Sequence, residues 1–343
     1  METITETIEK KSKSESLKLG FIGLGWIGLN RMERLMEHPK VTCAAMVEPV
    51  QINAERALAL AENIKLYTSI EQVIADPSID GIVIATPSAL HADQAAAALK
   101  AGKAVFCQKP LGRNLAEVQQ VLKAAAASDK LLSVDMSYRY TKAFAAVHKL
   151  IRSGELGKIY AVDLVFHNAY GPDKEWFFDI EKSGGGCLLD LGIHMLDLAL
   201  WSLDFPKINN VSSYLFKSGK MLEKGAKQVE DFSTANLSTA GGTTINLQCS
   251  WHISAGREAV IEAKFFGTAG GAAFKNVNGS FYDFTAEKYK GTQTEILVSP
   301  PENWSGNAGL VWADSVVAGI GFDPVTAQEY LKLAAIIDRI YGR

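Results

Sequence analysis

The sequence contains few cysteines, and none stands in a pair with metal-ligand spacing. Its 343 residues include four cysteines that lie far apart, without a C-x-x-C pair. This spacing argues against a zinc knuckle and against a disulfide framework. We therefore expect no bound metal, and reduced thiols as in a cytoplasmic protein. The four residues are Cys43, Cys107, Cys187 and Cys249.

An excess of one charge, a long apolar run and an internal repeat are also missing. The net charge of -3 argues against a nucleic-acid partner, and no run is long and apolar enough to span a bilayer. Residues 1–16 alternate Glu, Lys, Ser and Thr without the apolar segment of a secretory signal. We interpret them as a flexible tail, with an arm that crosses to a neighbouring subunit as the alternative.

A glycine-rich stretch is the most informative local pattern in the chain. The apolar run Leu19–Ile22 is followed by glycines in the order G-x-G-x-x-G and then by helical spacing. This order predicts a strand, a tight turn and a helix N-terminus that can bind the pyrophosphate of a dinucleotide. The residues expected at the pyrophosphate are Gly23, Gly25, Trp26, Ile27 and Gly28.

A carboxylate follows at the distance that a dinucleotide site requires. The apolar run Val41–Val47 ends in Glu48, about 20 residues beyond the last glycine, where a carboxylate accepts from a ribose hydroxyl. Glu48 would repel the 2′-phosphate of NADP, and residues 49–51 supply no basic side chain to neutralise it. We therefore predict NAD as the cofactor, with NADP less favoured.

The order of elements predicts two domains. Strands and helices alternate over residues 17–137, which is typical of a doubly wound parallel sheet, a Rossmann domain. Residues 138–343 instead carry strands joined by short glycine-containing turns, which predicts an α+β domain with a mainly antiparallel open sheet. A last helix, Asp323–Ile340, has an apolar stripe that could pack on the first domain. No helix is predicted for the sheet's other face, so we expect a homodimer or homotetramer.

Two segments carry candidate acid–base groups. Lys109 follows a strand and stands between Gln108 and Pro110, so it either enters the cleft or is an ordinary surface lysine. Asp190 and His194 are four residues apart, so on a helix they would share one face, which Asp197 would extend. Such a pair is either catalytic or a simple surface pairing. The glycine triplet at 184–186 would let the chain approach a ligand before this helix.

These motifs together resemble the Gfo/Idh/MocA oxidoreductase family. The motifs are Gly-Leu-Gly-Trp-Ile-Gly at 23–28, Thr86-Pro87 with His91, Ala101-Gly102-Lys103 leading to Gln108-Lys109-Pro110-Leu111, and Gly-Gly-Gly-x-Leu-x-Asp-x-Gly-x-His-x-x-Asp from 184. The resemblance implies a Rossmann domain, a second domain whose open sheet supports oligomerisation, and NAD(P)-dependent oxidation or reduction of sugars, cyclitols or related polyols. It assigns catalysis to Lys109, Asp190 and His194, and places Thr86, Pro87, His91, Gln108 and Lys109 at the cofactor.

One departure from the family pattern concerns the residue before Lys109. The family's usual Glu is Gln108 here, and an amide can form hydrogen bonds but supplies no negative charge. This exchange predicts that Lys109 loses its proton more readily than in relatives.

The leading interpretation is an NAD-dependent dehydrogenase that moves hydride between a ring carbinol carbon and nicotinamide. We expect Arg139 and Trp176 to contact the substrate together with Lys109, Asp190 and His194. One alternative is a glycoside hydrolase or lyase that retains NAD and uses transient oxidation followed by elimination. Another is a non-catalytic regulator that senses dinucleotide or sugar.

Overall fold

The computed structural model describes residues 16–61, 63–223 and 225–343 and contains two β-sheets. The first sheet has six parallel strands. The strand order is β3-β2-β1-β4-β5-β6, so the direction of winding reverses between β1 and β4. This is the predicted Rossmann sheet, and its switch point is where such folds bind ligands. The predicted tail lies outside the described residues except for Ser16. The strands are β1 (Leu17–Ile22), β2 (Val41–Val47), β3 (Lys65–Leu66), β4 (Gly81–Ile84), β5 (Ala104–Cys107) and β6 (Leu132–Val134).

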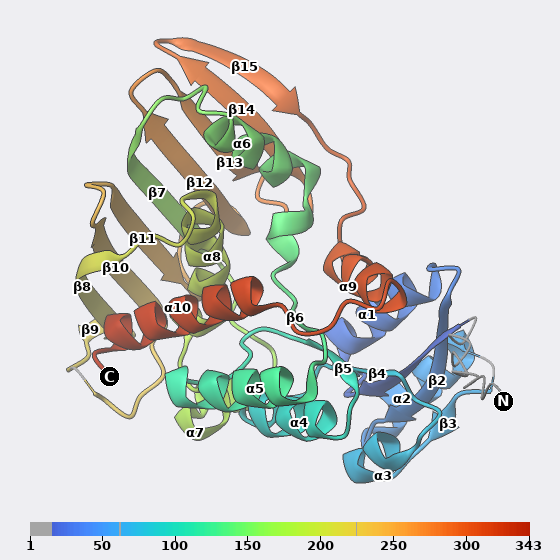
Figure 1. The fold of residues 1–343 in the computed structure, drawn as a ribbon. Coiled ribbons are helices and arrows are strands. Elements are labelled where there is room, and N and C mark those ends of the chain that lie inside the picture. Colours follow the sequence, from blue (N-terminus) through green and yellow to red (C-terminus); the bar gives the residue numbers. More distant parts are fainter. Residues whose placement is uncertain (1–15, 62, 224) are drawn as a thin grey trace, which may run out of the picture.

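Helices cover both faces of this sheet (Figure 1). The chain supplies α1 (Trp26–Met36), α2 (Gln51–Leu60), α3 (Ile70–Ala75), α4 (Ser88–Lys100) and α5 (Leu115–Ser128). A helix that the sequence analysis did not identify, α9 (Asn307–Val317), returns from the second domain and packs beside α1. Its Trp312 is buried with its ring centroid 5.7 Å from that of Phe106, so α9 belongs to the core of the first domain.

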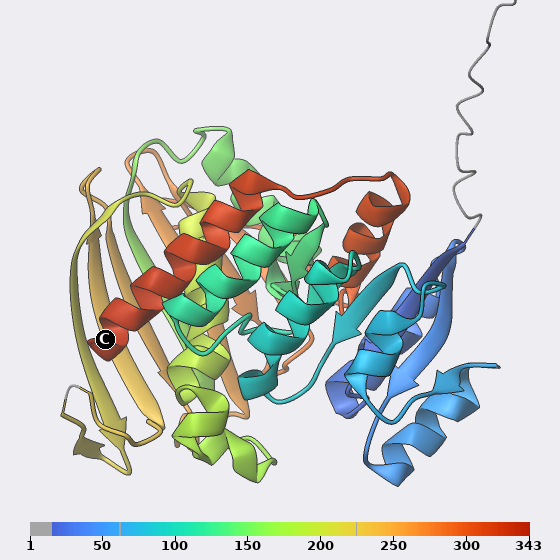
Figure 2. The same ribbon diagram turned by 60° about the horizontal axis from the view of Figure 1, so that its bottom comes forward.

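The second sheet has nine strands in the order β15-β14-β13-β12-β7-β11-β10-β8-β9. It is mainly antiparallel, as predicted, and β7 and β11 form a parallel pair. Figure 2 shows its helices gathered on one side, with the opposite face uncovered. The strands are β7 (Ile159–Asn168), β8 (Ile208–Lys217), β9 (Lys220–Met221), β10 (Phe232–Thr239), β11 (Thr244–Ser250), β12 (Ala259–Gly267), β13 (Gly271–Asn276), β14 (Phe284–Lys290) and β15 (Gln293–Val298).

The longer helices of the second domain pack on this sheet, and the middle one is buried on nearly every side. These longer helices are α6 (Lys142–Arg152), α8 (Ile193–Ser202) and α10 (Pro324–Tyr341). The shorter ones are the 3-10 turns η1 (Ser137–Tyr140) and η2 (Glu175–Phe178), the single turn α7 (Ile180–Ser183) and the π-helical turn η3 (Leu188–Gly192). Strand β10 begins at Phe232, so residues 229–231 form a loop before it. The intervening loop contributes to the site described below.

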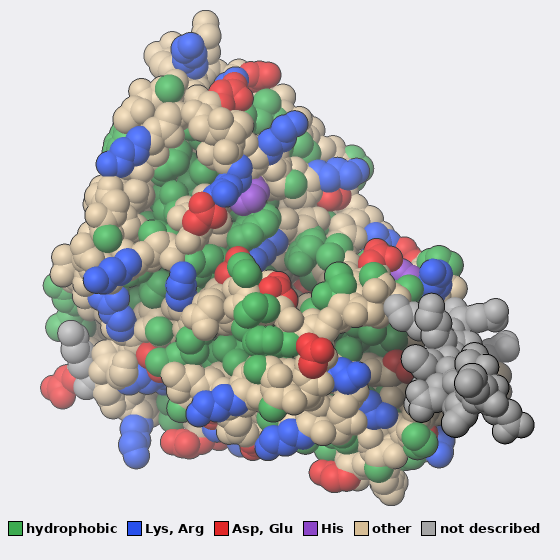
Figure 3. Space-filling model, in the orientation of Figure 1, with side chains coloured by type: hydrophobic (Ala, Val, Ile, Leu, Met, Phe, Trp, Pro, Cys, Tyr) green, Lys and Arg blue, Asp and Glu red, His purple; other side chains and the backbone are tan. Residues whose placement is uncertain are grey.

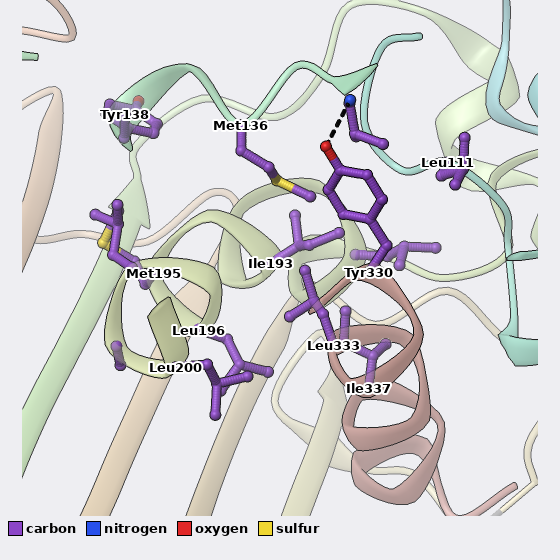
Figure 4. Packing of buried hydrophobic residues seen from close by; sticks show 14 of the residues in the cluster. Leu111, Met136, Tyr138, Ile193, Met195, Leu196, Leu200, Tyr330, Leu333 and Ile337 are labelled. Carbon is purple, nitrogen blue, oxygen red and sulfur yellow. Dashed lines mark hydrogen bonds between the residues drawn. The ribbon is translucent and has the colours of Figure 1, made fainter. Parts of the chain in front are cut away.

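Helix α10 packs along α5 and α8, so it contacts both domains. Asp323 caps its start, with the side chain accepting from Val325 N. In Figure 4, Leu333 and Ile337 of this helix point toward Ile193, at the start of α8. The Tyr330 hydroxyl accepts a 3.0 Å hydrogen bond from the backbone N–H of Val134, at the end of β6. Helix α10 therefore fixes the end of β6 relative to the start of α8.

The surface carries no dominant charge on the side that Figure 3 presents. Lysine and arginine side chains are interspersed there with aspartate and glutamate. Among the described residues, no helix is both long enough and apolar enough to cross a membrane.

Candidate active site

A cavity of about 1170 Å³ lies between the carboxyl ends of the first sheet and the segment that leads into α8. The first domain contributes the glycine loop and the ends of β2, β4 and β5, and the second domain contributes an aromatic wall and polar side chains that include Asp190 and His194. This is the edge of the sheet at which the sequence placed a ligand. Residues on the wall include Gly25, Trp26, Ile27, Glu48, Thr86, Pro87, His91, Gln108, Lys109, Trp176, Asp190, His194 and Trp304.

The backbone requires glycine at two positions of the glycine loop, and at a third position there is free space for a side chain. Gly23 has φ +80°, and a Cβ atom at Gly28 would lie 2.2 Å from the carbonyl oxygen of Gly23. Both glycines are therefore needed for the turn and for close packing of α1. A Cβ atom at Gly25 would meet nothing within 4 Å, and no side chain caps α1, which begins just after it. The loop thus offers unpaired N–H groups to the cavity.

Glu48 holds this loop through two hydrogen bonds. One carboxylate oxygen accepts from Leu24 N at 2.5 Å, and the other accepts from Val50 N at 2.8 Å. Each oxygen keeps a further lone pair for a hydroxyl group. The sequence did not predict that Glu48 would also hold the glycine loop.

His91 joins the ends of β4 and β5. Its Nδ1 lies 2.7 Å from the carbonyl oxygen of Pro110, and its Nε2 lies 2.7 Å from that of Thr86. Both ring nitrogens therefore face backbone, although His91 was expected to bind the cofactor. His91 also lines the cavity, so its contact with a cofactor stays a prediction, while its ring nitrogens connect the two loops. Thr86 also forms a 2.7 Å hydrogen bond to Gln94.

Lys109 and Asp190 meet in the cavity, although 81 positions separate them in the sequence. The Lys109 ammonium donates to the Asp190 carboxylate at 2.8 Å and to its backbone oxygen at 2.7 Å. The indole N–H of Trp251 donates to the other carboxylate oxygen at 3.1 Å. Asp190 therefore contacts Lys109 and Trp251, and it forms no hydrogen bond to His194 among the described residues.

His194 lies on the cavity wall with little exposure to solvent. Its Nδ1 is buried and has no hydrogen-bond partner in the described part of the chain. Burial, helped by the nearby cations of Lys109 and Arg31, holds the pKa of His194 well below its usual value. The imidazole is therefore neutral near pH 7 and can accept a proton.

The segment that carries Asp190 is held by contacts which the sequence analysis missed. Residues Leu188–Gly192 form a π-helical turn instead of the predicted α-helix. The buried carboxylate of Glu230 accepts from Gly186 N and Leu188 N, both at 2.9 Å, and from the Tyr341 hydroxyl at 2.9 Å. The available signal in the sequence was Glu230 itself, an acidic residue just before an apolar–polar alternating strand.

The glycine triplet has a different role from the one predicted. A Cβ atom at Gly185 would lie 2.1 Å from the Tyr341 hydroxyl oxygen, and one at Gly186 would lie 1.8 Å from the Glu230 carbonyl oxygen. These two glycines are therefore required for packing inside the protein. Close approach to a ligand is not needed to explain them.

The structure also corrects the expectations for Arg139 and Asp197. Arg139 is not on the cavity wall, and its guanidinium pairs with Asp197 at 2.6 Å and with Glu329 at 2.8 Å. Asp197 therefore points to this buried ion pair and does not extend a catalytic face. Trp176 does line the cavity, where its ring stacks on Phe177 with the centroids 3.8 Å apart.

A second buried charge cluster lies beside Gln108. The carboxylate of Asp135, at the end of β6, accepts from Arg31 Nε at 2.5 Å and from the side-chain amide of Gln108. Asp135 is fully buried, and Arg31 and Gln108 line the cavity. Neither Arg31 nor Asp135 was predicted, because their contact spans 104 positions.

The fold and the cavity define an oxidoreductase of the dinucleotide-binding class. Residues 17–136 match the family model described as an oxidoreductase family with an NAD-binding Rossmann fold, and residues 144–273 match the GFO/IDH/MocA C-terminal domain. The chain therefore belongs to the Gfo/Idh/MocA oxidoreductase family, as the motifs indicated. It is an NAD(P)-dependent oxidoreductase.

Individual relatives agree with this placement. Over 263 residues the chain is 32% identical to a provisionally named UDP-kanosamine synthase oxidoreductase subunit from Amycolatopsis mediterranei, covering 72% of each chain. It is 26% identical over 263 residues to inositol 2-dehydrogenase from Rhizobium meliloti, covering 76% of each. The crystal structure of GenD2 from gentamicin A biosynthesis, in complex with NAD, is similar with a TM-score of 0.80 and 25% identity, over 96% of this chain and 95% of that one.

The residues of the cavity fit a dinucleotide. Gly25 and the uncapped start of α1 suit a pyrophosphate, because a side chain at Gly25 would fill the space in front of these N–H groups. Glu48 suits a ribose hydroxyl, and Gln108 and Lys109 lie farther along the same wall. No cluster of three His, Cys, Asp or Glu side chains suited to a metal occurs within residues 16–61, 63–223 and 225–343.

Proposed function

We propose that this protein is an NAD-dependent dehydrogenase or reductase that acts on a ring carbinol of an uncharged sugar, cyclitol or related polyol. The observation that carries the proposal is the convergence of Lys109, Asp190 and His194 on the cavity wall beside the dinucleotide loop. When bound, nicotinamide accepts or supplies the hydride. The protein must then handle the hydroxyl proton.

His194 is the group best suited to accept that proton during oxidation. Its imidazole is neutral because burial opposes the charged form, and it faces the same cavity as Lys109. The Lys109 ammonium can donate to the hydroxyl oxygen and stabilise the negative charge that develops there. Asp190 keeps that ammonium in place, so we assign it a positioning role.

An uncharged substrate follows from the charge balance of the cavity. Each lysine and arginine among its described lining residues already has an acidic partner within 3 Å: Lys109 with Asp190 at 2.8 Å, Arg31 with Asp135 at 2.5 Å and Lys174 with Asp173 at 2.9 Å. Outside the glycine loop, whose N–H groups suit the dinucleotide, a substrate phosphate or diphosphate would have to compete with these carboxylates for a cation. Recognition of a nucleotide-activated sugar, which the name of one relative mentions, is therefore disfavoured for this chain.

Aromatic side chains suit the apolar faces of a sugar ring. Trp176 and Phe177 form one part of the wall, and Tyr138 and Trp304, whose ring centroids are 5.2 Å apart, form another. Such surfaces bury the C–H face of a ring while Lys109 and His194 contact its hydroxyl groups. We propose Trp176 as a substrate contact on this basis.

NAD is the proposed cofactor because Glu48 would repel a 2′-phosphate. A homodimer or homotetramer built on the open face of the second sheet, and a cytoplasmic location, are part of the same proposal. The four cysteines support the location, since all are free and buried.

A cofactor and substrate panel tests this function. Hexoses, cyclitols, methyl glycosides, sugar phosphates and nucleotide sugars are incubated with NAD or NADP, and reduced cofactor is measured by absorbance. We expect turnover with NAD and an uncharged member of the panel. Equal or faster turnover with NADP contradicts the cofactor proposal, and a preference for phosphorylated substrates contradicts the substrate class. Release of an aglycone without net NADH would favour the hydrolase or lyase alternative.

A further inference from the structure

Asp135 is a buried carboxylate next to the cavity. The proposed proton transfer does not use this residue. It has no exposed surface and lies at the end of β6, between Arg31 of α1 and Gln108, which follows β5. One of its oxygens, Oδ2, accepts from Arg31 Nε at 2.5 Å and from Gln108 Nε2. The other oxygen, Oδ1, is buried without a partner in the described part of the chain. The Arg31 and Gln108 bonds are therefore the contacts that hold this side chain.

Arg31 donates a hydrogen bond to Asp135 across a buried ion pair and is itself held in place. Its guanidinium also donates to Asn30 Oδ1 at 2.5 Å and to Ser305 Oγ at 2.9 Å. The pair places a cation directly beside the buried carboxyl group. Asp135 accepts both of its side-chain hydrogen bonds, from Arg31 and from Gln108.

This acceptor determines which way the Gln108 amide faces. Because the NH₂ group of Gln108 donates to Asp135 Oδ2, its Oε1 points away from Asp135. Gln108 lies on the cavity wall, next to Lys109. Its Oε1 has no hydrogen-bond partner among the described residues, so it is available as an acceptor on the side of the cavity.

We propose that Asp135 is a positioning residue that fixes Gln108 with its side-chain oxygen toward the bound dinucleotide, where it accepts from an N–H or O–H group of the cofactor. The inference rests on the proposed use of NAD. It also explains how the chain functions with Gln108 where its family usually has Glu. The negative charge is carried one strand away, by Asp135, and is balanced there by Arg31.

Exchanging the acid and the amide gives a direct test. Four variants are compared with the wild type: Asp135→Asn, Gln108→Glu, the double variant with both changes, and Asp197→Asn as a matched control. Asp197 is a similarly buried aspartate paired with an arginine, but it lies outside the cavity wall. The readouts are the Kd for NAD by calorimetry between pH 6 and 9, and the Tm.

The expected pattern follows from the hydrogen-bond chemistry. Asp135→Asn lets the Gln108 amide turn, so the Kd for NAD rises about tenfold, the effect of one lost hydrogen bond. Gln108→Glu places two carboxyl groups side by side, which favours a proton shared between them. Because this proton is lost as the pH rises, the Kd for NAD of this variant rises with pH. The double variant again has one acid and one amide, with an acceptor toward the cavity, and returns the Kd to within about threefold of wild type. Asp197→Asn lowers the Tm and leaves the Kd unchanged.

Each other outcome has a definite meaning. An Asp135→Asn variant with a lower Tm but an unchanged Kd shows a merely structural role and overturns the inference. So does a double variant that binds NAD no more tightly than the weaker single variant. If the wild type binds NAD but oxidises no sugar, only the proposed dehydrogenase activity is contradicted. The Kd values of the variants then still decide the role of Asp135. A wild type that binds no dinucleotide overturns both.

Discussion

Trp251 and Asp190 are joined by a 3.1 Å hydrogen bond from the indole N–H to the carboxylate, on the side opposite Lys109. The carboxylate is thus held from two directions, and its orientation fixes that of the Lys109 ammonium. Trp251→Phe removes the N–H and keeps most of the ring. We expect kcat to fall by about 10- to 100-fold, since a hydrogen bond to a charged group is worth about 1.5–3 kcal/mol.

Trp312→Phe is the control for this change. The Trp312 indole N–H is buried without a partner, and Trp312 does not line the cavity. Steady-state kinetics should show an unchanged kcat for this variant. If Trp251→Phe also retains full kcat, the Trp251 bond does not position Asp190.

Lys109 and His194 are the groups expected to act directly on the substrate hydroxyl. Lys109→Met and His194→Ala should each lower kcat by about 10²- to 10⁴-fold, the usual contribution of general acid–base groups. The Kd for NAD should change little, because the glycine loop is untouched. The double variant should be little worse than either single one, since the two groups act as a unit. Near-normal kcat in either single variant would assign that residue a structural role.

Two glycines of the same loop should respond in opposite ways to alanine. Gly25 has open space at the position of a Cβ atom, whereas at Gly28 that atom would collide with the backbone of Gly23. Gly25→Ala should therefore retain its Tm and lose NAD affinity by about tenfold or more, because the methyl group obstructs the N–H groups of α1. Gly28→Ala should be destabilised by about 1–3 kcal/mol or fail to fold. Calorimetry and thermal unfolding separate these effects, and a destabilised Gly25→Ala variant would show that Gly25 is a packing residue.

The lowered pKa of His194 predicts how stability depends on pH. The unfolded chain takes up a proton on this imidazole below about pH 6.5, but the buried ring in the folded protein does not. The contribution of His194 to the free energy of unfolding is therefore fully present above pH 6.5 and is lost as the pH falls from there toward the lowered pKa. Between pH 6.5 and 5, the Tm of the wild type should fall more steeply than that of His194→Asn. Parallel curves would mean that His194 is not held neutral.

The uncovered face of the second sheet predicts self-association. Gln248 of β11 is exposed on this face, while its neighbours Leu247 and Cys249 are buried under the helices. Light scattering should give a dimer or tetramer for the wild type, and Gln248→Arg should shift it toward monomer through charge repulsion across a symmetric interface. The Tm measured at low protein concentration should be the same for both. A monomeric wild type at working concentration would contradict this prediction.

The features that the sequence predicted well are those encoded over short distances. The β1 turn into α1 and the carboxylate at Glu48 depend on spacing within one βαβ unit, so the glycine pattern was sufficient to find them. The regular alternation of strands likewise identified both sheets. Helix α9 was missed because it belongs to the first domain in space but follows the second in sequence.

The parts that could not be predicted depend on contacts between distant segments or on irregular backbone. The π-helical turn before α8 breaks the 3.6-residue period from which a shared face of Asp190, His194 and Asp197 was inferred. Arg139 was placed in the pocket by its position near the domain junction. Its acidic partners, Asp197 and Glu329, lie 58 and 190 positions away, so no local pattern pointed to them.

Tyr341 of α10 supports Glu230, and Glu230 in turn supports the segment that carries Asp190. This order of support has a consequence for synthesis on the ribosome, where the chain emerges from its N-terminal side. The strands of the first sheet emerge before the second domain, whereas helix α9, which completes their core, emerges after it. The acidic residue that holds Lys109 can receive its final support only once α10 has emerged. The end of the chain is therefore the last segment that the paired Lys109 and Asp190 require.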